Sequence, residues 1–257
     1  MKHAKHILKV FAFISIHVSI VLSFNDQKLE EVKFDTLGRV LGSKKSSSKK
    51  HSSSKSSKKE SRHRHCLMRS DFHTDRVSGY IKAQYVNEET VDFNVRINLR
   101  DFQPDGQVIM DGSQISWHLH TDWKNRNIHS GSNDQCAKSL TGNHYDPTVA
   151  CGPASEWVNS NGICYGPQGQ IADSVNYSCT PTSNWRTSCE RGDISGKLGP
   201  FVVDEKSNGY HEIYFKGRNT FFATEREAYY NGHHWSFVLH YGPSNTRILC
   251  AKVEMYC

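Results

Sequence analysis

Apolar and polar residues alternate without interruption between positions 92 and 99, and this pattern narrows the choice of fold more than any other. The apolar members are Phe93, Val95, Ile97 and Leu99. A period of two is typical of a β-strand with one buried and one solvated face. Further short strands are expected over 79–86, 107–110, 113–120, 210–215, 235–240 and 247–254. No long helical periodicity occurs. The chain therefore predicts an all-β fold, a Greek-key β-sandwich or barrel of about eight strands, in which 121–199 forms a long loop system.

All eight cysteines lie in the part of the chain that begins at position 66. They are Cys66, Cys136, Cys151, Cys164, Cys179, Cys189, Cys250 and Cys257. An even number in an exported chain indicates a disulfide framework of up to four bridges. The alternative, zinc-finger ligation, is disfavoured because no Cys-x-x-Cys spacing occurs. Residues 66–257 are expected to form one disulfide-bonded domain with a core of its own.

The N-terminal segment 1–23 has the composition of a secretory signal peptide. Lysines at positions 2, 5 and 9 precede an apolar run, which ends at Val21-Leu22-Ser23. A membrane anchor is the alternative, but the apolar run is shorter than the roughly 18 residues that span a bilayer and is interrupted by His17. No later apolar run is long enough to span a membrane. The mature protein is therefore expected to be secreted and extracellular, with Asn176 of Asn176-Tyr177-Ser178 as a glycosylation acceptor.

Residues 24–65 are rich in Lys, Ser and His and are expected to be a disordered tail. They contain twelve Lys and Arg against five Asp and Glu, whereas 66–257 contains seventeen against twenty-one. The basic character of the chain therefore belongs to its N-terminal part. Such a tail is either a solvated linker or a binding segment, through 43–65, for a polyanionic matrix, glycan or mineral surface. Nucleic acid is a less suitable partner for an exported chain.

Four histidines offer a set of nitrogen ligands for one copper ion. His118 and His120 are two residues apart in an expected strand, so both side chains project from the same face of the sheet. His144 and His240 complete the set. Imidazole suits copper, and a ligand set without thiolate favours a redox-active copper centre over a blue-copper or structural zinc site. The adjacent His233 and His234 are interpreted as surface residues, because neighbours on a strand face opposite ways.

The segments around these histidines resemble the copper-zinc superoxide dismutases, and most closely their secreted copper-only branch. The segments are Trp117-His118-Leu119-His120, Gly142-Asn143-His144-Tyr145-Asp146-Pro147, residues 189–199 (CERGDISGKLG), Ser236-Phe237-Val238-Leu239-His240 and residues 245–251 (NTRILCA). The resemblance extends over roughly residues 80–253. It implies a Greek-key sandwich that converts superoxide to oxygen and hydrogen peroxide.

The resemblance also assigns roles to individual residues. It implies copper ligation by His118, His120, His144 and His240, and a disulfide between Cys136 and Cys250. It places Arg247 beside the copper, where a permanent positive charge attracts and holds a small anion. The alternative for Arg247 is an ordinary exposed arginine on a strand. His144 is implied to carry one of the protons that peroxide formation consumes.

The chain departs from the ordinary members of that family in its zinc loop. No histidine occurs between His144 and His211, so zinc is expected to be absent. Glu190 and Asp193 have a spacing that resembles the copper-only enzymes, and we expect both carboxylates to orient His144 and to pass protons. The alternative is two solvated loop acids. Only five residues, 241–245, separate His240 from Thr246, and this short turn predicts a copper site open to solvent.

The long loop is expected to be held by disulfides in place of zinc. Among three connectivities we favour nested pairing, Cys151 with Cys189 and Cys164 with Cys179. By elimination, Cys66 then pairs with Cys257. A structural or metal-carrying protein of an extracellular or calcified matrix, or of plasma, remains the alternative function on the same fold. A polyanion-binding protein with a vestigial copper site is a third.

Overall fold

The computed structural model describes residues 65–159, 163–164, 177–206, 210–242 and 245–257. The chain divides into two units, 1–59 and 60–257, and all the described residues belong to the second. The expected signal peptide, the tail up to residue 64 and the glycosylation acceptor Asn176 lie outside the described residues. In the part that is described, no helix is long and apolar enough to cross a membrane.

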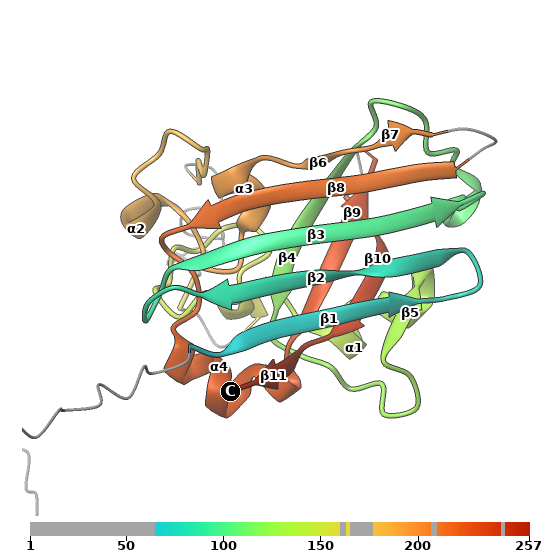
Figure 1. Cartoon of the computed structure of the whole chain (residues 1–257). Helices are drawn as coiled ribbons and strands as arrows, with labels where there is room; N and C mark the ends of the chain where they lie inside the picture. The colour runs from blue at the N-terminus through green and yellow to red at the C-terminus, as the bar shows by residue number, and fades with distance from the viewer. Residues whose placement is uncertain (1–64, 160–162, 165–176, 207–209, 243–244) are drawn as a thin grey trace, which may run out of the picture. The chain divides into compact units, whose positions relative to one another are not determined.

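The first of two antiparallel sheets has six strands in the order β11-β1-β2-β3-β8-β7 (Figure 1). Its strands are β1 (Leu67–His73), β2 (Val77–Tyr85), β3 (Val91–Arg100), β7 (Asp204–Glu205), β8 (Tyr210–Asn219) and β11 (Glu254–Tyr256). The alternating residues of β3 follow the predicted pattern, since Phe93, Val95, Ile97 and Leu99 are all buried. One face of this sheet therefore supplies half of the core.

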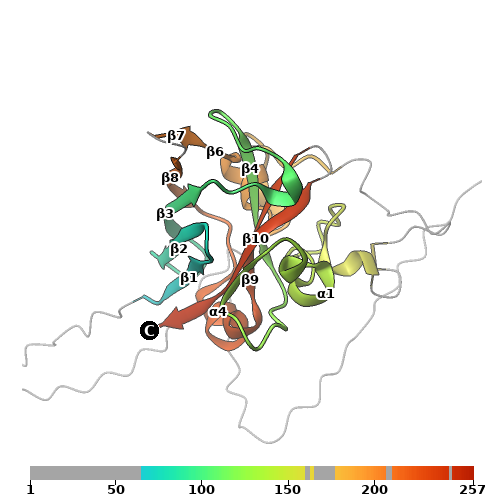
Figure 2. The same cartoon turned by 90° about the vertical axis from the view of Figure 1, so that its right-hand side faces the viewer.

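The second sheet has five strands in the order β5-β10-β9-β4-β6. Its strands are β4 (Gln114–His120), β5 (Ser130–Ser132), β6 (Phe201–Val202), β9 (Ser236–Tyr241) and β10 (Thr246–Lys252). Figures 1 and 2 show the two sheets as packed layers. The prediction of an all-β sandwich is confirmed. Four of the eleven strands in the described ranges, β5, β6, β7 and β11, are only two or three residues long, too short for a sequence pattern to reveal.

Helical segments are short and lie in the connections between strands. The 3-10 helices are η1 (Pro104–Gly106), η2 (Asn133–Cys136), η3 (Glu156–Asn159) and η4 (Gly232–His234), and the α-helices are α1 (Lys138–Thr141), α2 (Trp185–Ser188), α3 (Ile194–Leu198) and α4 (Glu225–Asn231). A capping box stabilises the start of α4, because Thr224 and Glu227 each accept a hydrogen bond from the other's backbone N–H.

One expected strand is absent, and one long strand was not expected. Residues 107–110 form no strand, because only Ile109 is buried there while Val108 and Met110 are exposed. Strand β1 was not expected, since the buried Ser70 interrupts its apolar face. The Ser70 hydroxyl donates a 2.7 Å hydrogen bond to the carbonyl of Lys252. This bond compensates the hydroxyl for the water that it loses on burial.

Aromatic side chains fill the space between the sheets. Phe93 meets Trp117 edge to face at 4.9 Å between ring centroids and Phe222 at 5.3 Å, and Trp117 stacks on Phe201 at 4.3 Å. Edge-to-face pairs at these separations add to the stabilisation that burial alone gives. Trp117 belongs to β4, so the core holds in place the strand whose other face carries His118 and His120.

Four disulfides occur, and two of them differ from the expected pairing. Cys66 pairs with Cys257 and Cys136 with Cys250, as expected. Nested pairing in the long loop is wrong. Cys151 pairs with Cys164, and Cys179 with Cys189, at sequence separations of 13 and 10. These bridges close two short consecutive loops in place of one long loop around a short one, and short loops lose less chain entropy on closure.

Candidate metal site

The four histidines come from two neighbouring strands and one loop. On β4, His118 and His120 share a face of the five-stranded sheet. On the adjacent β9, His240 lies opposite Ser116 and so points to the same face. His144 follows α1 and forms an isolated backbone bridge with His120. Figure 2 shows α1 on the side of this sheet that faces away from the six-stranded sheet, so the site lies outside the main core.

The imidazole nitrogens converge on one point. One ring nitrogen of each histidine lies within 4.8 Å of the others. Two metal–nitrogen bonds of roughly 2 Å span about 4 Å, so a small movement of the rings lets one ion contact all four. Within the described part of the chain, this is the one group of three or more histidine, cysteine or acidic side chains with such geometry.

The opposite nitrogen of each ring faces an oxygen acceptor. His120 Nδ1 lies 3.2 Å from the carbonyl of Gly142, and His240 Nδ1 lies 2.8 Å from the carbonyl of Asn245. A carbonyl only accepts, so both rings carry the proton on Nδ1 and leave Nε2 free to ligate. The two Nε2 atoms are 3.3 Å apart.

The other two rings face carboxylates. His144 Nδ1 lies 2.5 Å from Oε2 of Glu190, and His118 Nε2 lies 3.5 Å from Oδ1 of Asp193. The remaining nitrogens, His144 Nε2 and His118 Nδ1, are buried and have no hydrogen-bond partner. An unpartnered buried polar atom is costly, and two of them aimed at the same point fit a cation that receives both lone pairs.

Burial keeps the imidazoles neutral. The exposed fractions are 4% for His118, 0% for His120, 6% for His144 and 5% for His240. Loss of solvent lowers the pKa of His118 and of His144 to about 4 and that of His240 to about 2. Neutral rings at physiological pH present lone pairs without proton competition. The rings themselves are therefore shielded from solvent. The expectation that the short turn leaves the copper site open stays a prediction, because part of that turn lies outside the described residues.

The two acids of residues 190–193 are buried, so the alternative of solvated loop acids is wrong. Glu190 is 1% exposed and contacts His144, as expected. Burial, and then the charge of Asp193, raises the pKa of Glu190 well above its ordinary value. Asp193 differs from expectation, since its carboxylate faces His118 and caps α3 by accepting a 2.8 Å hydrogen bond from the Gly196 N–H. Each carboxylate therefore steadies a different ring.

Tyr177 joins these two acids, and the sequence patterns did not identify it. Its hydroxyl donates to Oδ2 of Asp193 at 2.8 Å and accepts from the backbone N–H of Glu190 at 3.1 Å. In the sequence it is only the middle residue of a glycosylation motif. No local pattern marks it because its partners lie thirteen and sixteen residues further along the chain.

Gly192 allows the acids to approach β4. Its carbonyl accepts from the N–H of Leu119, and its own N–H donates to the carbonyl of Tyr145. A Cβ atom at this position would lie 2.4 Å from the Leu119 carbonyl oxygen, which is closer than any side chain tolerates. Glycine therefore lets the segment 190–193 sit against both ligand-bearing segments.

Lys197 also holds the segment 190–193 in place, through hydrogen bonds to its backbone. Its Nζ donates to the carbonyls of Glu190, Arg191 and Phe221 at 3.3, 2.6 and 2.8 Å. Burial lowers the pKa of Lys197 to about 7, while the three acceptors match the three N–H donors of the ammonium group.

We expect Lys197→Met to lower the free energy of unfolding by about 3 kcal/mol, because it leaves three buried carbonyls without a donor. Urea unfolding followed by circular dichroism measures the change. Lys206→Met, on an exposed side chain, is the matched control and should leave the unfolding midpoint where it is. Equal midpoints for both variants would contradict this role for Lys197.

Arg247 lies beside the histidines and is not an ordinary exposed arginine. It is half-buried on β10, in register with His240 on β9. Its Nη1 donates to Oγ1 of Thr141 at 2.5 Å. Burial is the main cause that lowers the pKa of His120, His144 and His240, and the charge of Arg247 is a smaller one. The disulfide between Cys136 and Cys250 ties the segment before Thr141 to the same strand. The Thr141 hydroxyl therefore holds the guanidinium near the histidines.

Comparison with known proteins finds similarity in structure only. No protein-family model matches the chain, and no curated protein matches its sequence. A mutant of superoxide dismutase 5 from Candida albicans is 17% identical, with 75% of this chain and 93% of that chain covered and a TM-score of 0.44. The Cu(II) form of the same enzyme is 19% identical, with coverages of 75% and 93% and a TM-score of 0.42.

The clock protein EA4 is another match, at 12% identity, with coverages of 74% and 94% and a TM-score of 0.42. Identities and TM-scores this low carry no argument about activity. The functional reasoning therefore depends on the geometry of the four imidazoles and their acceptors in this chain.

Proposed function

We propose that the protein is a secreted, copper-dependent superoxide dismutase that works without zinc and converts superoxide to oxygen and hydrogen peroxide. One observation carries the proposal. Four neutral, buried imidazoles converge on one point while the opposite nitrogen of each ring faces an oxygen acceptor. Such a preorganised nitrogen set suits a metal that changes oxidation state, and His118, His120, His144 and His240 would hold it.

Copper, when bound, supplies the one-electron chemistry by alternating between Cu(II) and Cu(I). The residues of this chain have a different task, which is to bind the anion and to deliver two protons for each peroxide formed. Both tasks require groups within reach of the ligand set, and the acids near His144 and His118 together with Arg247 supply them.

Proton supply is assigned to the pair of Glu190 and His144. The 2.5 Å contact between Glu190 Oε2 and His144 Nδ1 is short enough for direct proton transfer. Because burial raises the pKa of Glu190, its carboxylate accepts a proton more readily than an exposed glutamate does. Tyr177 and Asp193 fix the backbone of this segment and the neighbouring ring, as positioning residues.

Arg247 is assigned the capture of superoxide. We expect Arg247→Ala to lower kcat/KM for superoxide about tenfold, since one fixed charge beside the site raises the rate of anion encounter by this order. The rate of the native protein should fall with added salt, and the rate of the variant should depend on salt less. Arg247→Lys, which keeps the charge, should retain part of the activity. Arg76→Ala, an exposed arginine, is the control, and an equal loss in both alanine variants would contradict the assignment.

The four disulfides support the proposal that the protein is secreted, since such bridges persist in oxidising compartments. We further propose that the basic segment 43–65 anchors the protein to a polyanionic matrix. Its charge excess is the supporting observation.

Deleting residues 24–65 should abolish salt-sensitive retention on a sulfated-polysaccharide resin and leave superoxide turnover within about twofold of the full chain. Retention of the shortened protein at the same salt concentration as the full chain would show that the tail is not the anchor. The full chain with its lysines acetylated is the matched control for charge.

A copper-carrying protein of plasma or of an extracellular or calcified matrix is the second candidate, because the same ligand set would serve storage. The two functions differ in one readout. Protein loaded with one copper per chain should consume superoxide catalytically if it is the enzyme, and only in amounts equal to its copper if it is a carrier. Metal analysis of the same sample tests the expected absence of zinc.

A further inference from the structure

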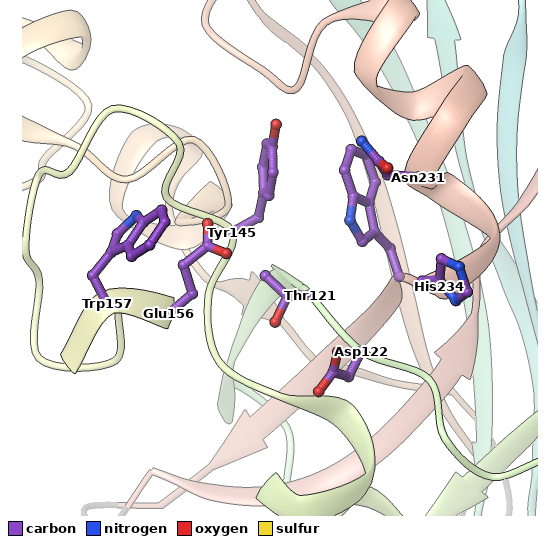
Figure 3. Close-up of a pocket in the computed structure, with 8 residues that line it drawn as sticks. Thr121, Asp122, Tyr145, Glu156, Trp157, Asn231 and His234 are labelled. Carbon is purple, nitrogen blue, oxygen red and sulfur yellow. The ribbon is translucent and has the colours of Figure 1, made fainter. Parts of the chain in front are cut away.

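A cavity lies close to the candidate metal site and has no part in the proposed chemistry. Thr121 and Tyr145, which line it, directly follow the candidate ligands His120 and His144 in the chain (Figure 3). The cavity encloses about 540 Å³ and opens to solvent. A space of this size accommodates a small organic molecule.

Aromatic rings form its walls, and most of them are held rigidly. Tyr145 and Trp235 are 8% and 3% exposed and lie 4.6 Å apart between ring centroids. The indole N–H of Trp157 donates to the carbonyl of Asp146 at 2.6 Å, which fixes the plane of the third ring. Preorganised aromatic faces lose little conformational entropy when a ligand binds.

The charged groups that line the cavity are both acids. Asp122 and Glu156 contribute carboxylates, and among the described lining residues there is no lysine or arginine. Glu156 is held in place because its Oε1 accepts from the N–H of Asp146 at 2.8 Å. Lys124 places its Nζ 2.7 Å from the carboxylate of Asp122, but its side chain is 60% exposed, so water screens its charge. The cavity is therefore electronegative.

We propose that this cavity binds a small organic cation, an alkylammonium or quaternary ammonium group, against the ring of Trp157 and beside the packed pair of Tyr145 and Trp235. The negative faces of the rings and the two carboxylates both favour positive charge. The same features disfavour an anion. The group of carboxylates offers no converging metal ligands, since the histidine cluster is the metal-type group among the described residues. The site is distinct from the copper centre.

Isothermal titration calorimetry on the full, copper-loaded chain tests the proposal. The probes are choline and its uncharged isostere 3,3-dimethylbutan-1-ol, which share shape and differ in charge. Choline should bind at least about tenfold more tightly, as expected for a desolvated cation–π site. Acetylated trimethyllysine amide, as a third probe, distinguishes a free cation from the same group carried on a protein. No binding of either cation, or equal binding of choline and the alcohol, would overturn the proposal.

Variants locate the binding. Trp157→Leu should weaken choline binding about tenfold, and Trp157→Phe, which keeps an aromatic face, should restore most of it. Asp122→Asn should weaken it severalfold without altering the loop. Trp185→Leu removes an indole from a separate surface depression and should have no effect. Copper content is the control for the integrity of the loop, because a disordered loop would change it. It should stay at one copper per chain in all of these variants. Equal losses in Trp157→Leu and Trp185→Leu would place the cation elsewhere and reject this site.

Discussion

Replacing His118 with alanine is expected to abolish copper retention and superoxide turnover together. The substitution removes one of four converging nitrogens and leaves the buried carboxylate of Asp193 without the ring that it faces at 3.5 Å. Loss of an outer partner of a metal ligand already costs 10–100-fold in affinity, so loss of the ligand itself should exceed about 100-fold. Copper content after dialysis against a chelator, and superoxide consumption followed spectroscopically, measure the two effects on one sample.

His129→Ala is the matched control for this substitution. The His129 side chain is 78% exposed and pairs with Glu254, away from the four converging rings. It should retain one copper per chain and full turnover. If His118→Ala kept stoichiometric copper at the same chelator concentration, the ligand set inferred from the geometry would be incorrect.

Replacing Glu190 with glutamine is expected to separate metal binding from turnover. Glutamine keeps an oxygen that accepts from His144 Nδ1–H, so the ring stays oriented and copper still binds when supplied in excess. The amide cannot hold a transferable proton. Turnover should therefore fall about 100-fold, the lower end of what a positioned acid–base group contributes.

The loss of turnover in Glu190→Gln is expected to depend on pH. In the native protein, burial and then the charge of Asp193 raise the pKa of Glu190, so this carboxylate takes up a proton at a higher pH than an exposed glutamate does. In the variant the protons must come from solvent, whose supply falls as pH rises, and the deficit should therefore widen with pH. Glu212→Gln, on β8 and paired with Arg96, is the control. Turnover of Glu190→Gln within twofold of the native protein at equal copper content would contradict the role.

The alternation of β3 and the His-x-His pair of β4 could be predicted from the sequence because each depends on a local period of two. His118 and His120 must share a face of any strand. The placement of Asp193 at His118, instead of at His144, could not be predicted in this way. It depends on how closely residues 190–193 approach β4, which Gly192 permits and no local pattern encodes.

Local sequence patterns also could not predict the pairing of the loop disulfides or the burial of the site. Four cysteines allow three connectivities, and their spacing alone does not distinguish consecutive from nested pairs. Likewise, the short turn after His240 does not reveal that the four rings are buried, because contacts such as the one between His144 and Glu190 join residues 46 apart in the sequence. Long-range packing decided both features.

The most direct test of the proposed copper enzyme is the rate at which protein with one copper and no zinc per chain consumes superoxide. We predict catalytic consumption with a second-order rate constant that approaches about 10⁸ M⁻¹ s⁻¹, near the diffusional ceiling for enzymes. The copper-loaded native protein should exceed the His118→Ala variant, treated identically, by orders of magnitude. Equal rates for the two proteins, or consumption that stops after one superoxide per copper, would contradict the proposed function.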